Sequence, residues 1–152
     1  PKVSLTSDQP QSLTLYTLLL LRTFNNLYLP EVVQKMGESY AKCLDMMEMD
    51  KKFILGLIQP VMDTGDVPVY RSAEERMQGF FRSIYESCCQ VMGKLGQAML
   101  QDFYSIPDLA TRLLNSAFCN LSNVPDYRLR AMLYILQHPK ALSFRWAPPS
   151  WM

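Results

Sequence analysis

The chain has 152 residues, of which 49% are apolar and 19% are charged, a balance that excludes both a chain disordered by composition and a protein that is membrane-like overall. Its 15 basic and 14 acidic residues give a net charge of +1, which lacks the clear basic excess of a dedicated nucleic-acid domain. Glycine is scarce, whereas leucine, methionine and glutamine are frequent, and this bias favours helices because unbranched side chains lose little rotamer freedom there.

The first predicted helix covers residues 9–24. Asp8 can act as its N-cap, and Pro10 falls in the first turn, where its missing N–H costs nothing. Apolar side chains nearly encircle the helix axis, which predicts a helix buried between neighbours. The longest apolar run of the chain, residues 18–21, is too short to span a bilayer.

A second helix is predicted over residues 30–47, with apolar side chains on one face and charged side chains on another. The charged residues are spaced as two favourable i,i+4 pairs, Glu31–Lys35 and Glu38–Lys42. We therefore expect this face to be solvated and self-neutralising rather than a basic patch.

An irregular connector follows over residues 49–70, where glycine and proline recur, with a short helical turn at residues 51–55. The third long helix begins at Ser72, which forms an S-x-x-E capping box with Glu75. Its apolar stripe is the most regular in the chain and comprises Met77, Phe80, Phe81, Ile84, Tyr85, Cys88 and Met92.

Two glycines, Gly93 and Gly96, are expected to end or loosen this third helix, and a short helical piece over residues 97–104 follows. Residues 105–108 and 123–126 then repeat one pattern, a cap residue, a proline in the first turn and an aspartate near the positive end of the helix dipole. They predict a fourth and a fifth helix, with core residues Leu109, Leu113, Leu114, Ala117 and Phe118, and Leu129, Met132, Leu133 and Leu136.

Together these elements predict an all-α fold in which antiparallel helix pairs stack in sequence order as HEAT-like repeats, an α-solenoid fragment. The first helix would pair with the second and the third with the fourth, while the fifth would open a pair whose partner is not supplied. We assign residues 8–137 to this repeat block and residues 138–152 to an irregular, divergent tail that lacks a cap and an apolar stripe. The expectation is a repeat array cut mid-unit from a much larger protein.

The sequence predicts no enzyme, no cofactor and no metal site. The four cysteines include no C-x-x-C pair, and the only histidine, His138, is far from all of them, which argues against a zinc site. We expect the cysteines to be reduced thiols packed as small apolar residues, as in an intracellular protein. A general base at His138 would need an orienting partner, and the sequence suggests none.

Several segments resemble, in order and spacing, consecutive parts of the exportin-5 family within the importin-β (karyopherin) superfamily. They are LRTFNNLYLPE (21–31), ILGLIQP (54–60), ERMQGFF (75–81), QDFYSIPDLATRLLNSAFCNLSNVPDYRLR (101–130) and PDYRLRAML (125–133). The resemblance covers residues 20–137 and extends over whole helices, so it is far more specific than a short motif.

The resemblance implies a right-handed solenoid of HEAT repeats that shuttles between nucleus and cytoplasm. Such a receptor carries double-stranded RNA, notably microRNA precursors, together with Ran-GTP, and releases its cargo when GTP is hydrolysed. It has no catalytic activity, and nuclear pore proteins are further expected partners of the full-length protein. The chain would lie in the second half of the solenoid, outside the N-terminal repeats that grip Ran, and would contribute cargo-cradling repeats.

RNA-binding candidates are the basic residues that no neighbouring glutamate neutralises. Arg112 in the fourth helix and Arg128 and Arg130 in the fifth meet this condition, and arginines on the inner wall of a solenoid suit A-form RNA, which is read through phosphates and 2′-hydroxyls. Arg76 and Arg82 are weaker candidates because each has a glutamate beside it. Two alternatives stay open: these are ordinary surface or inter-repeat arginines, or the chain is a helical protein-interaction scaffold that binds no RNA.

Overall fold

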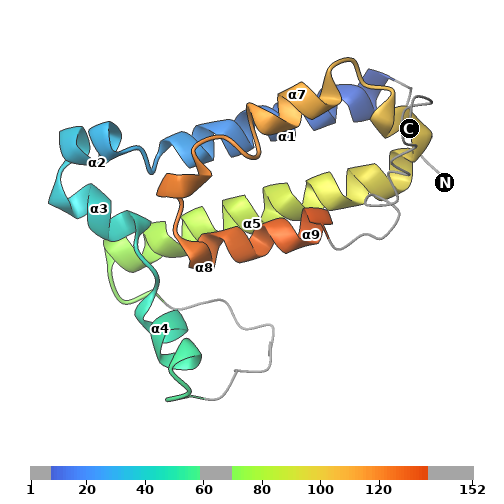
Figure 1. Ribbon diagram of the computed structural model, residues 1–152. Coiled ribbons are helices and arrows are strands. Elements are labelled where there is room, and N and C mark those ends of the chain that lie inside the picture. The colour runs from blue at the N-terminus through green and yellow to red at the C-terminus, as the bar shows by residue number, and fades with distance from the viewer. Residues whose placement is uncertain (1–7, 59–69, 137–152) are drawn as a thin grey trace, which may run out of the picture.

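The computed structural model describes residues 8–58 and 70–136, and every regular element in these two ranges is helical. The predicted all-α fold is therefore confirmed. Two long helices, α1 (Asp8–Asn26) and α5 (Ala73–Met99), lie side by side and run in opposite directions (Figure 1). Among the described helices, none combines the length and the apolarity needed to cross a membrane. The predicted tail, including His138, lies outside the described residues.

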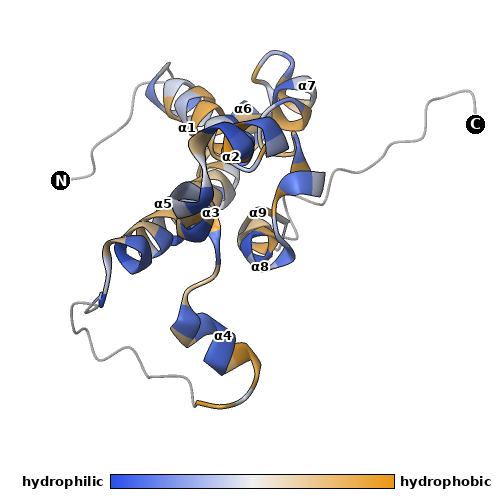
Figure 2. Cartoon of the chain, turned by 90° about the vertical axis from the view of Figure 1, so that its left-hand side faces the viewer, coloured by the Kyte–Doolittle hydropathy of each residue, from blue (hydrophilic) through white to orange (hydrophobic). Residues whose placement is uncertain are grey.

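The α1 helix buries one face and leaves the other open. Its buried residues recur every three or four positions, as one side of a helix requires, and are Thr14, Thr17, Leu18, Leu21, Phe24 and Asn25. On the opposite side Leu13, Tyr16, Leu19 and Leu20 are 47–68% exposed. Apolar residues, coloured orange, are seen along the ribbon of α1 (Figure 2). The prediction that α1 is buried all round is thus wrong for the described part of the chain.

Aromatic rings form the centre of the α1–α5 seam. Phe24 of α1 stacks on Tyr85 of α5, with ring centroids 4.6 Å apart and an interplanar angle of 27°. Phe81 meets the edge of Phe24 at 6.2 Å, and Tyr85 is only 1% exposed. Large aromatic side chains of this kind dominate the energy of a small core. The predicted stripe of α5 is wider than its buried face, because Met77, Phe80 and Ile84 remain 38–52% exposed.

The start of α5 has the predicted Ser72 cap, but the side chain of Glu75 bonds the residue before the cap, Arg71, rather than Ser72 itself. Ser72 Oγ accepts a hydrogen bond from the Glu75 N–H at 3.1 Å, while Glu75 Oε2 accepts one from the Arg71 N–H at 2.7 Å. The predicted end of the helix is wrong, because α5 runs through both of its expected glycine breaks. The helix ends instead at Met99, because the next residue, Leu100, has a positive φ of 48° that no longer fits a helix.

Tertiary packing explains why α5 continues past its glycines. Gly93 and Gly96 are both buried, and a Cβ added to Gly96 would lie 3.8 Å from the ring of Phe103. Phe103 belongs to α6 (Gln101–Tyr104), which folds back on the end of α5. Burial of the Phe103 ring beside Gly96 stabilises the helix by more than the cost of about 1 kcal/mol that glycine has, relative to alanine, inside a helix.

The predicted second helix is broken in two at Gly37, whose φ is 89°. It forms α2 (Pro30–Met36) and α3 (Glu38–Leu44), and neither seven-residue helix could cover the length of α1. The predicted pairing of the first helix with the second is therefore wrong, and α5 is the partner of α1. Of the two predicted ion pairs, Glu38–Lys42 forms at 3.1 Å and Glu31–Lys35 does not.

The predicted connector contains α4 (Glu48–Ile54), which confirms and extends the short helical turn expected there. The predicted fourth helix is shorter than expected, since α7 (Leu109–Leu114) is followed by turns and a 3₁₀ helix, η1 (Leu121–Asn123). Leu109 and Ala117 of its predicted core are buried, but Leu114 is 64% exposed.

The predicted fifth helix is a continuous run of α8 (Asp126–Leu129), the 3₁₀ helix η2 (Arg130–Met132) and α9 (Leu133–Leu136). Pro125 lies just before α8 and Pro107 just before α7, rather than in the first turns of these helices. The N-cap residues of the two helices make no side-chain cap hydrogen bond. The run packs along α5, so the expectation that the fifth helix lacks a partner is wrong. The side chain of Leu136, a predicted core residue, lies outside the described residues.

Asn25, fully buried at the end of α1, ties the segment after α7 to the seam. Its amide nitrogen Nδ2 donates to the carbonyl oxygens of Ser116, Ala117 and Cys119 at 3.3, 3.1 and 2.9 Å. A segment with so little regular structure must satisfy its buried carbonyls through side chains. Asn25 therefore substitutes for the missing helical hydrogen bonds of residues 116–119.

We predict that Asn25→Ala lowers the free energy of unfolding by about 2 kcal/mol, because the mutation leaves buried carbonyls without a donor. Asn26→Ala is the matched control, because Asn26 Oδ1 accepts an exposed hydrogen bond from Asn120 Nδ2 at 2.8 Å. This substitution should lower the free energy of unfolding by less than about 1 kcal/mol. Urea unfolding followed by circular dichroism measures both. Equal effects would contradict the anchoring role of Asn25.

The four cysteines are free thiols in the structure. Burial raises the pKa of Cys88, and it raises the pKa of Cys89, which is 0% exposed, to about 12. Because the thiolate is the reactive form, these two sites should be inert in the folded chain.

We expect N-ethylmaleimide at pH 7.5 to leave Cys88 and Cys89 unmodified in the native protein and to modify both in urea. Peptide mass spectrometry distinguishes them from the half-buried Cys43, which should react first. Native labelling of Cys89 as fast as Cys43 would show that the seam opens readily.

Candidate functional site

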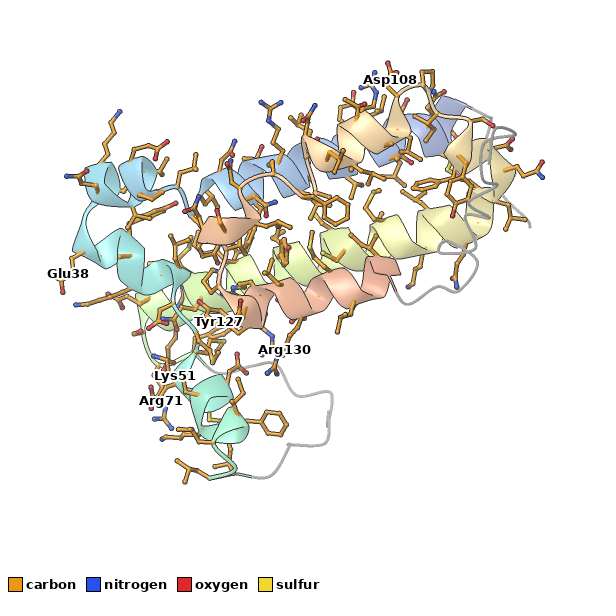
Figure 3. The ribbon with its side chains drawn as sticks, viewed as in Figure 1. Glu38, Lys51, Arg71, Asp108, Tyr127 and Arg130 are labelled. Carbon is orange, nitrogen blue, oxygen red and sulfur yellow. The ribbon has the colours of Figure 1, made fainter. Side chains whose placement is uncertain are left out.

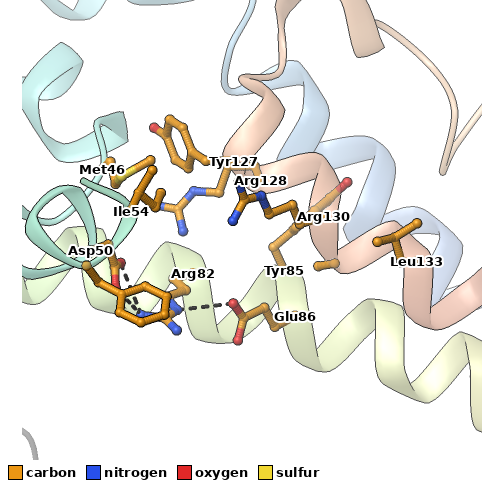
Figure 4. A pocket seen from close by; sticks show the side chains of 12 residues that line it. Met46, Asp50, Ile54, Arg82, Tyr85, Glu86, Tyr127, Arg128, Arg130 and Leu133 are labelled. Carbon is orange, nitrogen blue, oxygen red and sulfur yellow. Dashed lines mark hydrogen bonds and ion pairs between the residues drawn. The ribbon is translucent and has the colours of Figure 1, made fainter. Parts of the chain in front are cut away.

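A cleft of about 320 Å³ lies where α4, α5 and the α8–η2 run meet. Its lining combines three arginines with two carboxylates above an apolar floor (Figure 4). The residues around it are Met46, Asp50, Phe53, Ile54, Arg82, Tyr85, Glu86, Tyr127, Arg128, Arg130, Ala131 and Leu133. The three arginines differ sharply in their surroundings.

Arg82, on α5, is held by two carboxylates. Its Nη1 donates to both oxygens of Asp50 at 2.8 and 3.0 Å, and its Nε donates to Glu86 Oε1 at 3.1 Å. Burial opposes the charged form, but the charges of Asp50 and Glu86 outweigh it and raise the pKa of Arg82. All three side chains are 31–45% exposed, so solvent screens these ion pairs and each contributes little to stability.

Arg128, on α8, is buried, with only 5% of its surface exposed. Its Nε donates to Tyr28 Oη at 3.2 Å and its Nη2 donates to the carbonyl oxygen of Gln78 at 3.3 Å, while its guanidinium lies 5.3 Å from the centre of the Tyr127 ring. All of these partners are neutral, and no carboxylate of the described residues forms an ion pair with Arg128. Its charge helps to lower the pKa of Asp45, the carboxylate at the end of α3, but the two groups form no ion pair.

Tyr127 helps to hold α8 in place. Burial raises the pKa of Tyr127 to about 12, so its hydroxyl stays protonated and donates to the carbonyl oxygen of Leu44 at 2.7 Å. Gln78 makes a second link to α3 through Nε2, which donates to the carbonyl oxygen of Lys42 at 2.8 Å. The end of α3 is thereby bonded to both α5 and α8.

Arg130, on η2, is exposed, and its side chain makes no hydrogen bond or ion pair with the residues that the structure describes. Arg112 does not line the cleft; it lies on α7, and its Nε donates to the carbonyl oxygen of Pro107 at 3.1 Å. Figure 3 shows Arg130 on the side of α4, whereas Asp108, just before α7, lies at the far end of the molecule. The three predicted RNA-binding arginines are thus split between two surfaces.

A second, larger hollow of about 550 Å³ lies between α5, the α6–α7 segment and α9, and its lining is mainly apolar. Gly93 and Gly96 contribute to this lining together with Phe103 and Phe118. Within residues 8–58 and 70–136, no group of three His, Cys, Asp or Glu side chains is placed to hold a metal ion. The arginine-lined cleft is therefore the better candidate for a charged ligand.

Comparison with known proteins accounts for this helical arrangement. The model of the Exportin-5 family matches residues 10–140, slightly more than the 20–137 expected from the sequence. The chain is 52% identical to Exportin-5 of Homo sapiens and to Exportin-5 of Mus musculus over 125 residues, which is 82% of the chain. The chain belongs to the exportin-5 family. It spans 10% of the length of these two relatives.

Sequence reasoning singled out Arg128 and Arg130, which line this candidate cleft, but it did not indicate the ion pair between Arg82 and Asp50. Arg128 and Arg130 were candidates because no local glutamate neutralises them. Arg82 ranked lower because of Glu86, and its main partner, Asp50, lies 32 positions earlier in the chain. Only the fold brings α4 against α5, so no local signal in the sequence could have indicated this ion pair.

We predict very different losses of stability for substitutions of the two neighbouring arginines. Arg128→Ala removes two hydrogen bonds and a buried stem and should lower the free energy of unfolding by about 2–4 kcal/mol. Arg130→Ala should change it by no more than about 0.5 kcal/mol, because the side chain is exposed. Chemical denaturation of the two variants provides the measurement, and a neutral Arg128→Ala would show that the buried guanidinium does not support α8.

Proposed function

We propose that this chain contributes a block of helical repeats to a nuclear export receptor that carries double-stranded RNA, such as microRNA precursors, from nucleus to cytoplasm with Ran-GTP. Membership of the exportin-5 family supports an export receptor, which acts by binding rather than by catalysis. Because the chain spans a tenth of its relatives, the contacts with Ran and with nuclear pore proteins belong to the proposal for the whole protein.

Within this block, we assign RNA contact first to Arg130, because its exposed guanidinium has no partner among the described residues. Arg128 lines the same cleft and adds a positive charge that forms no ion pair among the described residues, although its own burial makes it a positioning residue. Arginine binds phosphate oxygens through paired N–H groups, and duplex RNA presents phosphates and 2′-hydroxyls rather than readable base edges. Arg112 would contact RNA only at a separate surface.

The alternative is a helical protein-interaction scaffold that binds no RNA. One observation favours it, the open apolar face of α1, where Leu13, Tyr16, Leu19 and Leu20 are exposed. A partner docked there would be held by apolar burial, so its affinity would change little with salt. The two proposals therefore differ in a property that can be measured.

The test is fluorescence anisotropy of a labelled RNA duplex with the 152-residue chain, repeated across a salt series. We expect the duplex to bind more tightly than either of its single strands, and the logarithm of the affinity to fall linearly with the logarithm of salt concentration. Absence of duplex binding at low salt, or binding that salt does not weaken, would favour the scaffold.

Charge reversal identifies the surface that binds. Arg130→Glu should weaken duplex binding and reduce the salt slope by about one, as expected for the loss of one phosphate contact. Arg22→Glu makes the same charge change on α1, away from the cleft, and should alter both quantities much less. Equal losses in the two variants would indicate binding by overall charge and would remove Arg130 from the site.

A further inference from the structure

The α4 helix is attached to the cleft by charge rather than by apolar burial. None of its residues is buried, and Phe53, Ile54 and Leu55 are 46–70% exposed. Asp50 of α4 bonds Arg82, and Lys51 of α4 bonds Asp45 at 2.9 Å in a second exposed ion pair. Movement of α4 away from α5 would expose only the part of Phe53 and Ile54, about half of each side chain, that is now covered.

The carboxylate of Asp50 accepts hydrogen bonds from the guanidinium group of Arg82, the same group that would bind a phosphate. Its two carboxylate oxygens lie 2.8 and 3.0 Å from Arg82 Nη1, and a phosphate group presents a similar pair of oxygens at similar distances. The cleft holds three arginines against two carboxylates, and Arg128, more than nine-tenths buried, has no carboxylate partner among the described residues. This excess of one positive charge in the lining favours binding of an anion in the cleft, where it would compete with Asp50 for Arg82.

We propose that the cleft is a phosphate-binding site gated by Asp50: a phosphodiester group of duplex RNA displaces the carboxylate from Arg82, bridges Arg82 and Arg130, and releases α4 from α5. This inference rests on the proposed RNA-binding function and adds the site, its competitor and a movement. The three arginines and the two carboxylates share one cleft, with Asp50 drawn against Arg82 and Arg130 facing the same space (Figure 4).

Competition of this kind predicts that removing the carboxylate charge strengthens RNA binding. Asp50→Asn should raise the affinity for the duplex about two- to fivefold, the range that an exposed ion pair is worth. Asp102→Asn on α6 makes the same charge change outside the cleft and should raise the affinity much less. Circular dichroism should confirm that both variants keep the helical content of the parent chain.

Release of α4 is tested on the unmodified 152-residue chain by hydrogen exchange. Saturating duplex RNA should speed amide exchange in residues 48–54 while leaving α1 unchanged, and Asp50→Asn should speed the same amides without RNA. Bound RNA with unchanged or slower exchange in α4 would overturn the gating, as would equal affinity gains in the two Asp→Asn variants. A chain that binds no duplex at all would instead overturn the proposed function and this inference with it.

Discussion

The stacking of Phe24 on Tyr85 joins the two long helices around which the described core is built. It closes the seam between α1 and α5, and the elements of the cleft depend on both helices. Just after α1, Tyr28 accepts the hydrogen bond of Arg128, which holds α8, while Tyr85 itself lines the floor of the cleft. A ring pair 4.6 Å apart therefore connects core packing to the surface that we propose for RNA.

The arginines of the cleft illustrate how one residue type takes different roles through its surroundings. Arg128 is enclosed by neutral acceptors and acts mainly on the structure, whereas Arg82 is neutralised by carboxylates on the surface. The side chain of Arg130 contacts neither a neutral acceptor nor a carboxylate among the described residues, and for this reason we assign RNA contact to it first. An exposed ion pair is cheap to exchange, whereas a buried hydrogen-bonded arginine is not, so ligand binding would rearrange α4 before it disturbed α8.

Local chemistry allowed the sequence to predict the all-α class, the N-cap at Ser72 and the Glu38–Lys42 pair, because each depends on residues within one turn. Long-range packing defeated the other predictions. Burial of Phe103 carries α5 past Gly96, and the positive φ of Gly37 splits the helix that was expected to cover α1. Of the cleft, the sequence indicated Arg128 and Arg130 but could not indicate Asp50, whose contact with Arg82 exists only in the folded chain.

Photo-crosslinking of 4-thiouridine-labelled duplex RNA to the 152-residue chain, followed by peptide mass spectrometry, tests the central claim most directly. If phosphates bind in the cleft, adducts should concentrate on residues 126–132 and on the part of α5 around Arg82, and the labelling should disappear at high salt. Adducts confined to α7 and the outer face of α1, or none at low salt, would contradict the assignment of this cleft to RNA.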